Sequence, residues 1–294
     1  MLFRNRRCNF LFQNLSLKIV NNTLLLLLAS HAMFGQALQP SLSAPYTGIG
    51  VYSKNFTDAF SGMVNQAALA QATAAAAGVY GERRFMLKEL SNYTVAVVLP
   101  SKLGGFGLTA RYFGSEHFNH AQFGIGFGKK LGSKIDFGIQ FNYNSIKQAG
   151  YGSSSVINVE AGTILHLTEK LQMGIHVCNP AGGKFGKSNS EKLASVYTAV
   201  FGYEVSDKLL IGAEISKQED QPVNMIPVMQ YDFAKQFFAR LGIATGTGNY
   251  FCGLGVQWKI CRVDIITNWH TQLGFTPAIM LLFNLHEPVQ QKKD

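Results

Sequence analysis

The amino-acid sequence predicts an all-β fold: a transmembrane, antiparallel, up-and-down β-barrel of about 14 strands. Three observations predict it. Only 15% of the residues are charged, whereas 47% are hydrophobic, and an average soluble domain has roughly 25% charged residues. Beyond the N-terminus, no apolar run reaches the roughly 18 residues of a transmembrane helix. From about residue 76 onward, apolar and polar residues alternate, which places them on opposite faces of a strand.

Residues 1–37 have the composition of a secretory signal peptide. Three arginines lie within the first seven residues, a short leucine-rich stretch follows at 24–28, and small residues surround a cleavage position after Ala37. The alternative, a transmembrane anchor, requires a longer apolar run. This segment carries 4 of the 26 basic residues and none of the 17 acidic residues, so its removal lowers the net charge from +9 to +5. The remaining basic residues are scattered, which argues against a nucleic-acid partner.

Residues 38–75 do not alternate, and we interpret them as an N-terminal plug, or hatch, segment. A wide ring of strands leaves more interior space than its own side chains fill, and most loops are too short to enter it. Alternate glycines in Gly124–Gly128 would let such a plug approach the wall closely. The alternative is an arm that stays in the periplasm. The plug candidates are Asp58, Phe60, Asn65 and Leu69.

Residues 76–285 form the predicted barrel, and residues 286–294 a polar C-terminal tail. Tight lysine-containing turns, such as Leu131–Lys134 and Ser206–Lys208, alternate with looser connections, of which residues 179–193 are the longest. Short periplasmic turns, longer outer loops and an even strand number are typical of bacterial outer-membrane barrels. The predicted strands start near residues 76, 91, 104, 119, 133, 154, 170, 195, 208, 223, 235, 249, 261 and 275.

A soluble sandwich or propeller would show the same alternation, with its apolar face turned inward. Here the aromatic residues gather near the ends of the segments, as an interfacial girdle requires, and the opposite face is rich in Gly, Asn, Gln and charge. Within a bilayer, only a closed ring of strands pairs every backbone group. We therefore expect a monomer in the outer membrane of a Gram-negative bacterium, surrounded by lipid.

The alternation also assigns charged side chains to the lumen, because charge on the lipid face costs a few kcal/mol at mid-bilayer. They form either a salt-bridge ladder that fixes the plug or a polar path for a solute. Pro227 has no N–H to donate to a neighbouring strand, so we expect a bulge or lateral kink there. The lumen-facing candidates are Glu82, Arg84, Arg111, Asp136, Glu214, Arg240, Lys259, Arg262 and Asp264.

No motif predicts catalysis, a metal site or a cofactor. Residues 181–188 match a permissive phosphate-loop pattern, but they lie in a predicted outer loop instead of between a strand and a helix. His117 and His120 have the spacing of two metal ligands but lack a third. The cysteines beyond the signal peptide are three in number and cannot close a disulfide framework. We therefore expect a protein that is not an enzyme and binds no cofactor.

Several short motifs resemble known outer-membrane families. Asn65-Gln-Ala-Ala-Leu69 looks like the Asp…Asn-Pro-Ala-x-Leu hatch of the fatty-acid-transporter-like (FadL-like) barrels, with Gln66 where that family usually has Pro. The motifs at 78–90, 111–114, 151–152, 177–180 and 273–277 resemble the PorV/PorQ family, over nearly the whole chain after the signal peptide. This resemblance implies a fourteen-stranded barrel of fatty-acid-transporter type. The best-known members of the PorV/PorQ family serve the type IX secretion system.

The sequence leaves two functions open. The first is passive transport of small hydrophobic molecules across the outer membrane. The alternative is a non-enzymatic accessory or scaffold of a type IX-like secretion system, with secretion-system proteins as partners.

Overall fold

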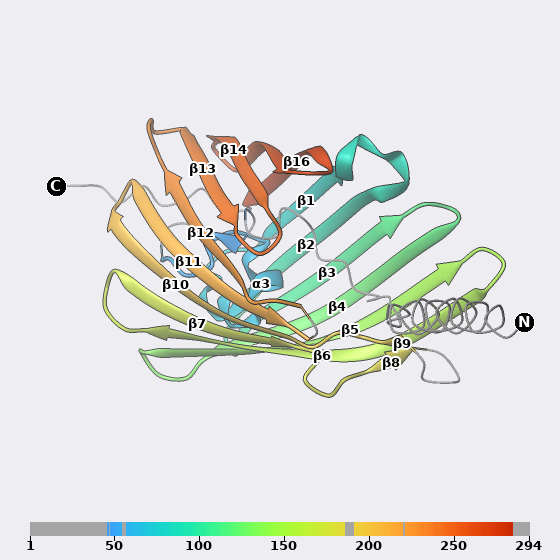
Figure 1. Ribbon diagram of the computed structural model, residues 1–294. Helices are drawn as coiled ribbons and strands as arrows, with labels where there is room; N and C mark the ends of the chain where they lie inside the picture. Colours follow the sequence, from blue (N-terminus) through green and yellow to red (C-terminus); the bar gives the residue numbers. More distant parts are fainter. Residues whose placement is uncertain (1–45, 47, 55–56, 186–190, 220, 285–294) are drawn as a thin grey trace, which may run out of the picture. The chain divides into compact units, whose positions relative to one another are not determined.

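The computed structural model describes residues 46, 48–54, 57–185, 191–219 and 221–284. The predicted signal peptide and C-terminal tail lie outside these residues. The described residues form a closed barrel of fourteen antiparallel strands, in which β1 pairs with β16 to complete the ring (Figure 1). The predicted fold class is confirmed, and every barrel strand begins within two residues of its predicted start. The barrel strands are β1 (Ala76–Arg83), β2 (Ser91–Ser101), β3 (Gly104–Gly114), β4 (Phe118–Lys130), β5 (Ile135–Gln148), β6 (Gly152–His166), β7 (Leu171–Cys178), β10 (Val196–Ser206), β11 (Leu209–Gln218), β12 (Asn224–Tyr231), β13 (Phe237–Ala244), β14 (Asn249–Trp258), β15 (Cys261–His270) and β16 (Gly274–Asn284).

Short helices and a small hairpin complete the described structure. In the connection between β7 and β10, β8 (Lys184–Phe185) pairs with β9 (Glu191–Lys192). The remaining elements are α3 (Ser61–Val64), the 3-10 turn η1 (Gln66–Gln71), and the 3-10 turns η2 (Arg84–Met86) and η3 (Lys88–Leu90) between β1 and β2. Among the described residues, no helix combines the length and the apolar character needed to cross a membrane.

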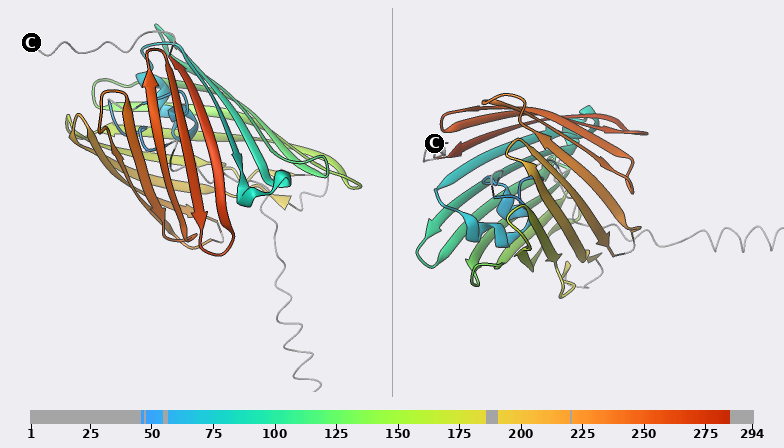
Figure 2. Two further views of the ribbon diagram at one scale, coloured as in Figure 1. Left: turned by 90° about the horizontal axis from the view of Figure 1, so that it is seen from above. Right: turned by 90° about the vertical axis from the view of Figure 1, so that its left-hand side faces the viewer.

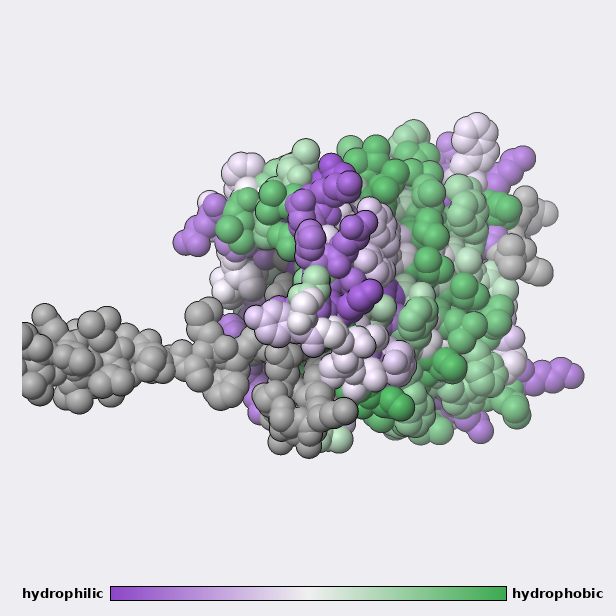
Figure 3. All heavy atoms as spheres, turned by 90° about the vertical axis from the view of Figure 1, so that its right-hand side faces the viewer, coloured by the Kyte–Doolittle hydropathy of each residue, from purple (hydrophilic) through white to green (hydrophobic). Residues whose placement is uncertain are grey.

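The exterior of the barrel is apolar because the alternation turns large hydrophobic side chains outward. On β15, Ile265 is 70% exposed, whereas its neighbour Asp264 is fully buried in the interior. Phe141 and Asn142 on β5 repeat the same contrast, with 54% and 0% exposure. Figure 3 shows hydrophobic residues covering much of one side of the exterior, with hydrophilic residues toward its margins. A soluble protein would bury these residues, so this surface fits contact with lipid.

The two ends of the barrel differ in their connections. At one end, two to five residues join β2 to β3, β4 to β5, β6 to β7, β10 to β11, β12 to β13 and β14 to β15. At the other end lie the η2–η3 connection and the long connection that contains β8 and β9. We call these the short-turn end and the loop end. The two ends of the barrel sequence, Ala76 and Asn284, pair with each other at the short-turn end.

The ladder between β12 and β13 stops early, beside Pro227. It runs from the pair of Tyr231 with Ala239 to the pair of Val228 with Gly242, and stops there. Its register would next place Pro227 opposite Ile243, but proline has no N–H to donate. The two segments are hydrogen-bonded again just beyond β13, where the Thr245 amide donates to the Met225 carbonyl at 3.0 Å. The structure therefore has a gap in the hydrogen bonding where the sequence predicts a kink.

Candidate functional site

The described part of the N-terminal segment, within residues 46–71, lies inside the barrel (Figures 1 and 2). Its apolar side chains are removed from solvent: Tyr46 and Val51 are fully buried, and Tyr52, Phe60 and Leu69 are each 2% exposed. The predicted plug candidates Phe60 and Leu69 thus contact the inner wall in the same apolar cluster as residues of β1, β2 and β16.

Glycines on the inner wall allow this close approach. At eight wall positions, a Cβ atom would come within 2.7 Å of an atom of the N-terminal segment, closer than real Cβ contacts allow. At Gly174, for example, it would lie 1.8 Å from the ring of Tyr52. Of the predicted glycine stripe, Gly128 belongs to this set, whereas Gly124 faces Asn142 and Gln140. We call the set the glycine belt: Gly78, Gly105, Gly128, Gly138, Gly162, Gly174, Gly202 and Gly253.

Asn65 and Gln66 bind the segment to the polar side of the wall. The Asn65 side chain accepts a hydrogen bond from the Ala67 amide at 3.0 Å and so caps η1. Its Nδ2 donates to the hydroxyl of Tyr52 and to the carbonyl oxygens of Thr163 and Ile175 on the wall. Gln66 Nε2 donates to Glu160 Oε2 at 2.8 Å. Gln66, which replaces the proline of the hatch motif, is therefore itself an anchor.

A charged cluster holds the segment to β13 and β15. Arg262 forms ion pairs with Asp264 at 2.6 Å and with Asp58 of the segment at 3.2 Å. Arg240, fully buried, lies 3.8 Å from the Asp58 carboxylate and donates to the Tyr46 carbonyl at 3.0 Å. The Tyr46 hydroxyl donates to Asp264 at 3.1 Å. Four of the charged residues singled out in the sequence thus meet in one cluster that joins wall and segment.

The other predicted charges are dispersed. Glu82 is buried on β1 and forms an ion pair with Arg84 at 3.1 Å. Because β1 ends at Arg83, Arg84 belongs to η2, but the Arg84 side chain points back to Glu82. Asp136 on β5 accepts one hydrogen bond from Gln71 of the segment, at 3.1 Å, and lies 2.8 Å from His166. Arg111 and Glu214 lie on the lumen faces of β3 and β11 and are partly exposed.

Lys259 does not face the lumen, contrary to the prediction from alternation. β14 ends at Trp258, and Lys259 is an exposed residue of the turn to β15, with a φ of 49°. The parity of side chains along a strand no longer applies once the backbone leaves the strand.

The structure reveals a polar network that the sequence reading missed. Glu160 on β6 accepts hydrogen bonds from Gln66 and from Asn142 at 2.8 Å each, and lies 3.2 Å from His176. On the same side, Asn144 donates to Asn158 at 2.6 Å. The wall residues of this network all sit at inward parity, so alternation alone marks their direction. Their mutual contacts depend on the register between strands.

The inner wall therefore carries both polar networks and an apolar cluster, and the apolar cluster lies beside the charges of Arg240, Arg262 and Asp264. The wall from β3 to β7 presents amides, histidines and charge. The wall of β12–β16, β1 and β2 contributes an apolar cluster around Tyr46 and Phe60 of the segment. The wall members of this apolar cluster include Tyr80, Ala96, Val98, Ile226, Ala244, Phe251, Ile266, Ala278, Met280 and Leu282.

At the short-turn end, a hydrogen bond and an ion pair also join the segment to the wall. Ser53 Oγ donates to Glu204 Oε1 at 2.6 Å, and the Lys54 ammonium pairs with Glu169 at 2.5 Å. The hydrogen bond from Lys54 lowers the pKa of the Glu169 carboxyl. Both residues of this second pair are exposed, so solvent and salt screen the attraction and the pair adds little to stability.

The motifs considered for other chemistry are not brought together. His117 is exposed, whereas His120 is buried and contacts Asn144 Oδ1 at 3.2 Å. Within the described ranges, no group of three or more His, Cys, Asp or Glu side chains is arranged to hold a metal ion. The described part of 181–188 contains β8 and no helix that would complete a phosphate loop.

Comparison with known proteins finds likeness at the level of the fold. No family model matches the chain, and no curated protein matches it. Among solved structures, a Pseudomonas aeruginosa FadL homologue aligns with a TM-score of 0.53 at 10% identity, over 81% of this chain and 96% of that one. The Pseudomonas putida toluene transporter TodX aligns with a TM-score of 0.54 at 9% identity, over 79% of this chain and 96% of that one. The Ralstonia pickettii toluene transporter TbuX aligns with a TM-score of 0.53 at 9% identity, over 78% of this chain and 93% of that one. The chain thus has the fold of a FadL-like outer-membrane barrel.

Proposed function

We propose that this protein is an outer-membrane channel for the passive transport of small hydrophobic molecules, with residues 46–71 acting as its plug. One observation carries the proposal: a separate chain segment fills the barrel beside an apolar cluster of the inner wall, instead of the wall side chains filling it alone. Solved barrels of the same fold include proteins described as toluene transporters, which supports a solute of this class.

The apolar cluster connects the lumen to the interruption in the wall. Ile226 and Ala244, which the register would pair across the β12–β13 gap, both belong to this cluster. Pro227 lies between Ile226 and Val228, and Val228 also packs against the cluster. A hydrophobic solute released from beside Phe60 would therefore meet apolar side chains as far as the gap, and would leave there into the lipid.

The charged cluster and the polar network fit the role of holding the plug. Some of their contacts run between the segment and the wall, as those of Asp58 with Arg262 and of Gln66 with Glu160 do. In this proposal a solute passes when these contacts open. No contact among the described residues favours the secretion scaffold over transport.

Cross-linking the plug to the wall tests the proposal. Ser53 and Glu204 contact each other through their side chains, so Ser53→Cys combined with Glu204→Cys places two thiols within reach of a short, reducible bis-thiosulfonate reagent. The background is a variant with Cys178, Cys252 and Cys261 replaced by serine. In liposomes, toluene and fatty-acid uptake should fall to the protein-free rate after cross-linking and recover after reduction.

Each single-cysteine variant, treated with the same reagent, is the control and should keep its uptake. Uptake that is unchanged by cross-linking would show that the segment does not have to move. If the uncross-linked protein gave no uptake of either solute, transport of hydrophobic molecules would be excluded as its function.

A further inference from the structure

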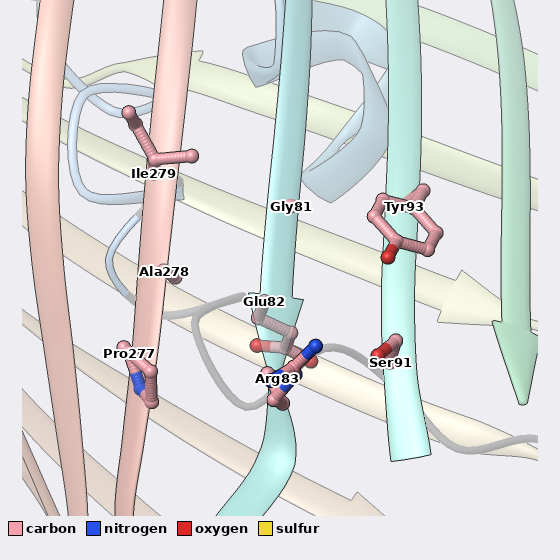
Figure 4. A pocket seen from close by; sticks show the side chains of 8 residues that line it. All are labelled: Gly81, Glu82, Arg83, Ser91, Tyr93, Pro277, Ala278 and Ile279. Carbon is pink, nitrogen blue, oxygen red and sulfur yellow. The ribbon is translucent and has the colours of Figure 1, made fainter. Parts of the chain in front are cut away.

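The outer surface of the wall carries a recess over β1 that the transport proposal does not use. It has a volume of about 340 Å³ and lies across β16, β1 and β2 (Figure 4). Gly81 forms its floor, and the side chains of Tyr93 and Ile279 stand on either side of it. Tyr93 and Ile279 are 56% and 51% exposed and face the membrane side of the barrel.

The recess lies where the ladder between β1 and β16 ends. The ladder between β1 and β16 ends at Glu82–Ala278, and the next residue of β16 is Pro277, which has no N–H to donate. Glycine at position 81 leaves the outer face of β1 without a side chain. The recess therefore lies near the loop end of the barrel.

A single cation, Arg83, lines this apolar recess. Arg83 is exposed and points outward, opposite in parity to the buried Glu82. Glu82 is already engaged with Arg84, Tyr80 and Asn92. Among the described residues, no carboxylate lies within salt-bridge distance of Arg83. An outward arginine in a membrane strand is costly at depth and is tolerated near the interface, where phosphate groups supply the counter-charge.

We propose that this recess binds a phosphorylated glycolipid of the outer leaflet, with an acyl chain over Gly81 between Tyr93 and Ile279 and a phosphate on Arg83. The choice of this lipid follows from charge and position. The unpaired guanidinium matches a phosphate bidentately, and the loop end faces the outer leaflet in barrels whose short turns are periplasmic. The inference rests on the membrane placement given above but not on solute transport.

Native mass spectrometry of the purified full-length protein in detergent, titrated with diphosphoryl lipid A, tests this site. Arg83→Gln removes the charge and should weaken the first binding event about tenfold, the usual size of one lost charge-assisted contact. Gly81→Leu fills the floor and should weaken it similarly. A Cβ at Gly81 would lie 3.5 Å from the Tyr93 ring, an ordinary contact, so this variant is expected to fold.

Lys102→Gln, an exposed cation in the turn between β2 and β3 at the short-turn end, is the matched control and should leave lipid A binding unchanged. Equal binding by the native protein and Arg83→Gln would overturn the site. So would an equal loss in Lys102→Gln, or phosphatidylglycerol binding as tightly as lipid A. Toluene uptake into liposomes that contain no lipid A separates failure of this inference from failure of the proposed function.

Discussion

At the scale of single residues, what matters most in this protein is the absence of side chains. The segment inside the barrel approaches the wall at positions where even a methyl group would collide with its backbone or rings. Gly162 and Gly138 are opposite neighbours on β6 and β5 and contact Asn65 and Gln66. The polar anchors reach their partners only because these glycines leave room.

Gly138→Ala is predicted to loosen the plug. Its Cβ would lie 2.2 Å from the carbonyl carbon of Gln66, which is backbone and cannot rotate away. Overpacking of this kind costs about 1–3 kcal/mol, so the free energy of unfolding in urea should fall by that amount. The segment should also become more sensitive to added protease.

Gly81→Ala serves as the control for that experiment, because its Cβ would meet only the Tyr93 ring at 3.5 Å. It should match the native protein in both measurements. A Gly138→Ala variant with native stability and native protease resistance would show that the segment is not packed against β5.

At the scale of elements, the decisive feature is where strands stop pairing. Two prolines, Pro227 in β12 and Pro277 in β16, lie next to interruptions in the ladders. The first interruption borders the apolar cluster of the lumen, and the second borders the outer recess. A proline without an N–H thus lies beside each of these two features of the wall.

Pro227→Val is predicted to close the gap between β12 and β13. Valine restores an N–H opposite Ile243 and suits a lipid-facing strand position. Amide hydrogen exchange should slow around Ile226 and Ile243, and toluene uptake into liposomes should fall several-fold. Pro100→Val, near the short-turn rim of β2, is the matched control and should leave uptake unchanged. Full uptake by Pro227→Val would exclude the gap as the exit.

At the scale of the whole molecule, the barrel is inside out relative to a soluble protein. Apolar residues cover the outside, whereas buried amides and charges lie inside, beside the apolar cluster. This arrangement is stable only where the outside meets lipid, because no other packing would offset the exposure of so many aromatic and aliphatic side chains.

Ile265→Arg tests that placement. Ile265 lies in the middle of β15, paired with Leu254 and Ile279, and is 70% exposed. Arginine at mid-bilayer costs about 2–4 kcal/mol, so the fraction folded in phosphatidylcholine vesicles should drop at intermediate urea, as read from heat-dependent gel mobility. Ile265→Ala is the control. Equal folding of both variants would mean that this face does not contact the bilayer.

The barrel could be derived from the amino-acid sequence alone. Alternation with a period of two, together with the position of the lysine-containing turns, set the strand number, the strand starts and the direction of each side chain. This works because strand geometry is local: parity follows from the backbone of the strand alone. It failed at Lys259, where the strand ends one residue earlier.

Which of the inward residues contact one another could be seen only in the folded barrel. The Asp58–Arg262–Asp264 cluster, the network around Glu160 and the glycine belt each join residues that are distant in the chain. Their contacts depend on the register between strands and on the path of the N-terminal segment through the lumen. Neither is encoded in a local period, since both result from the closure of the whole ring.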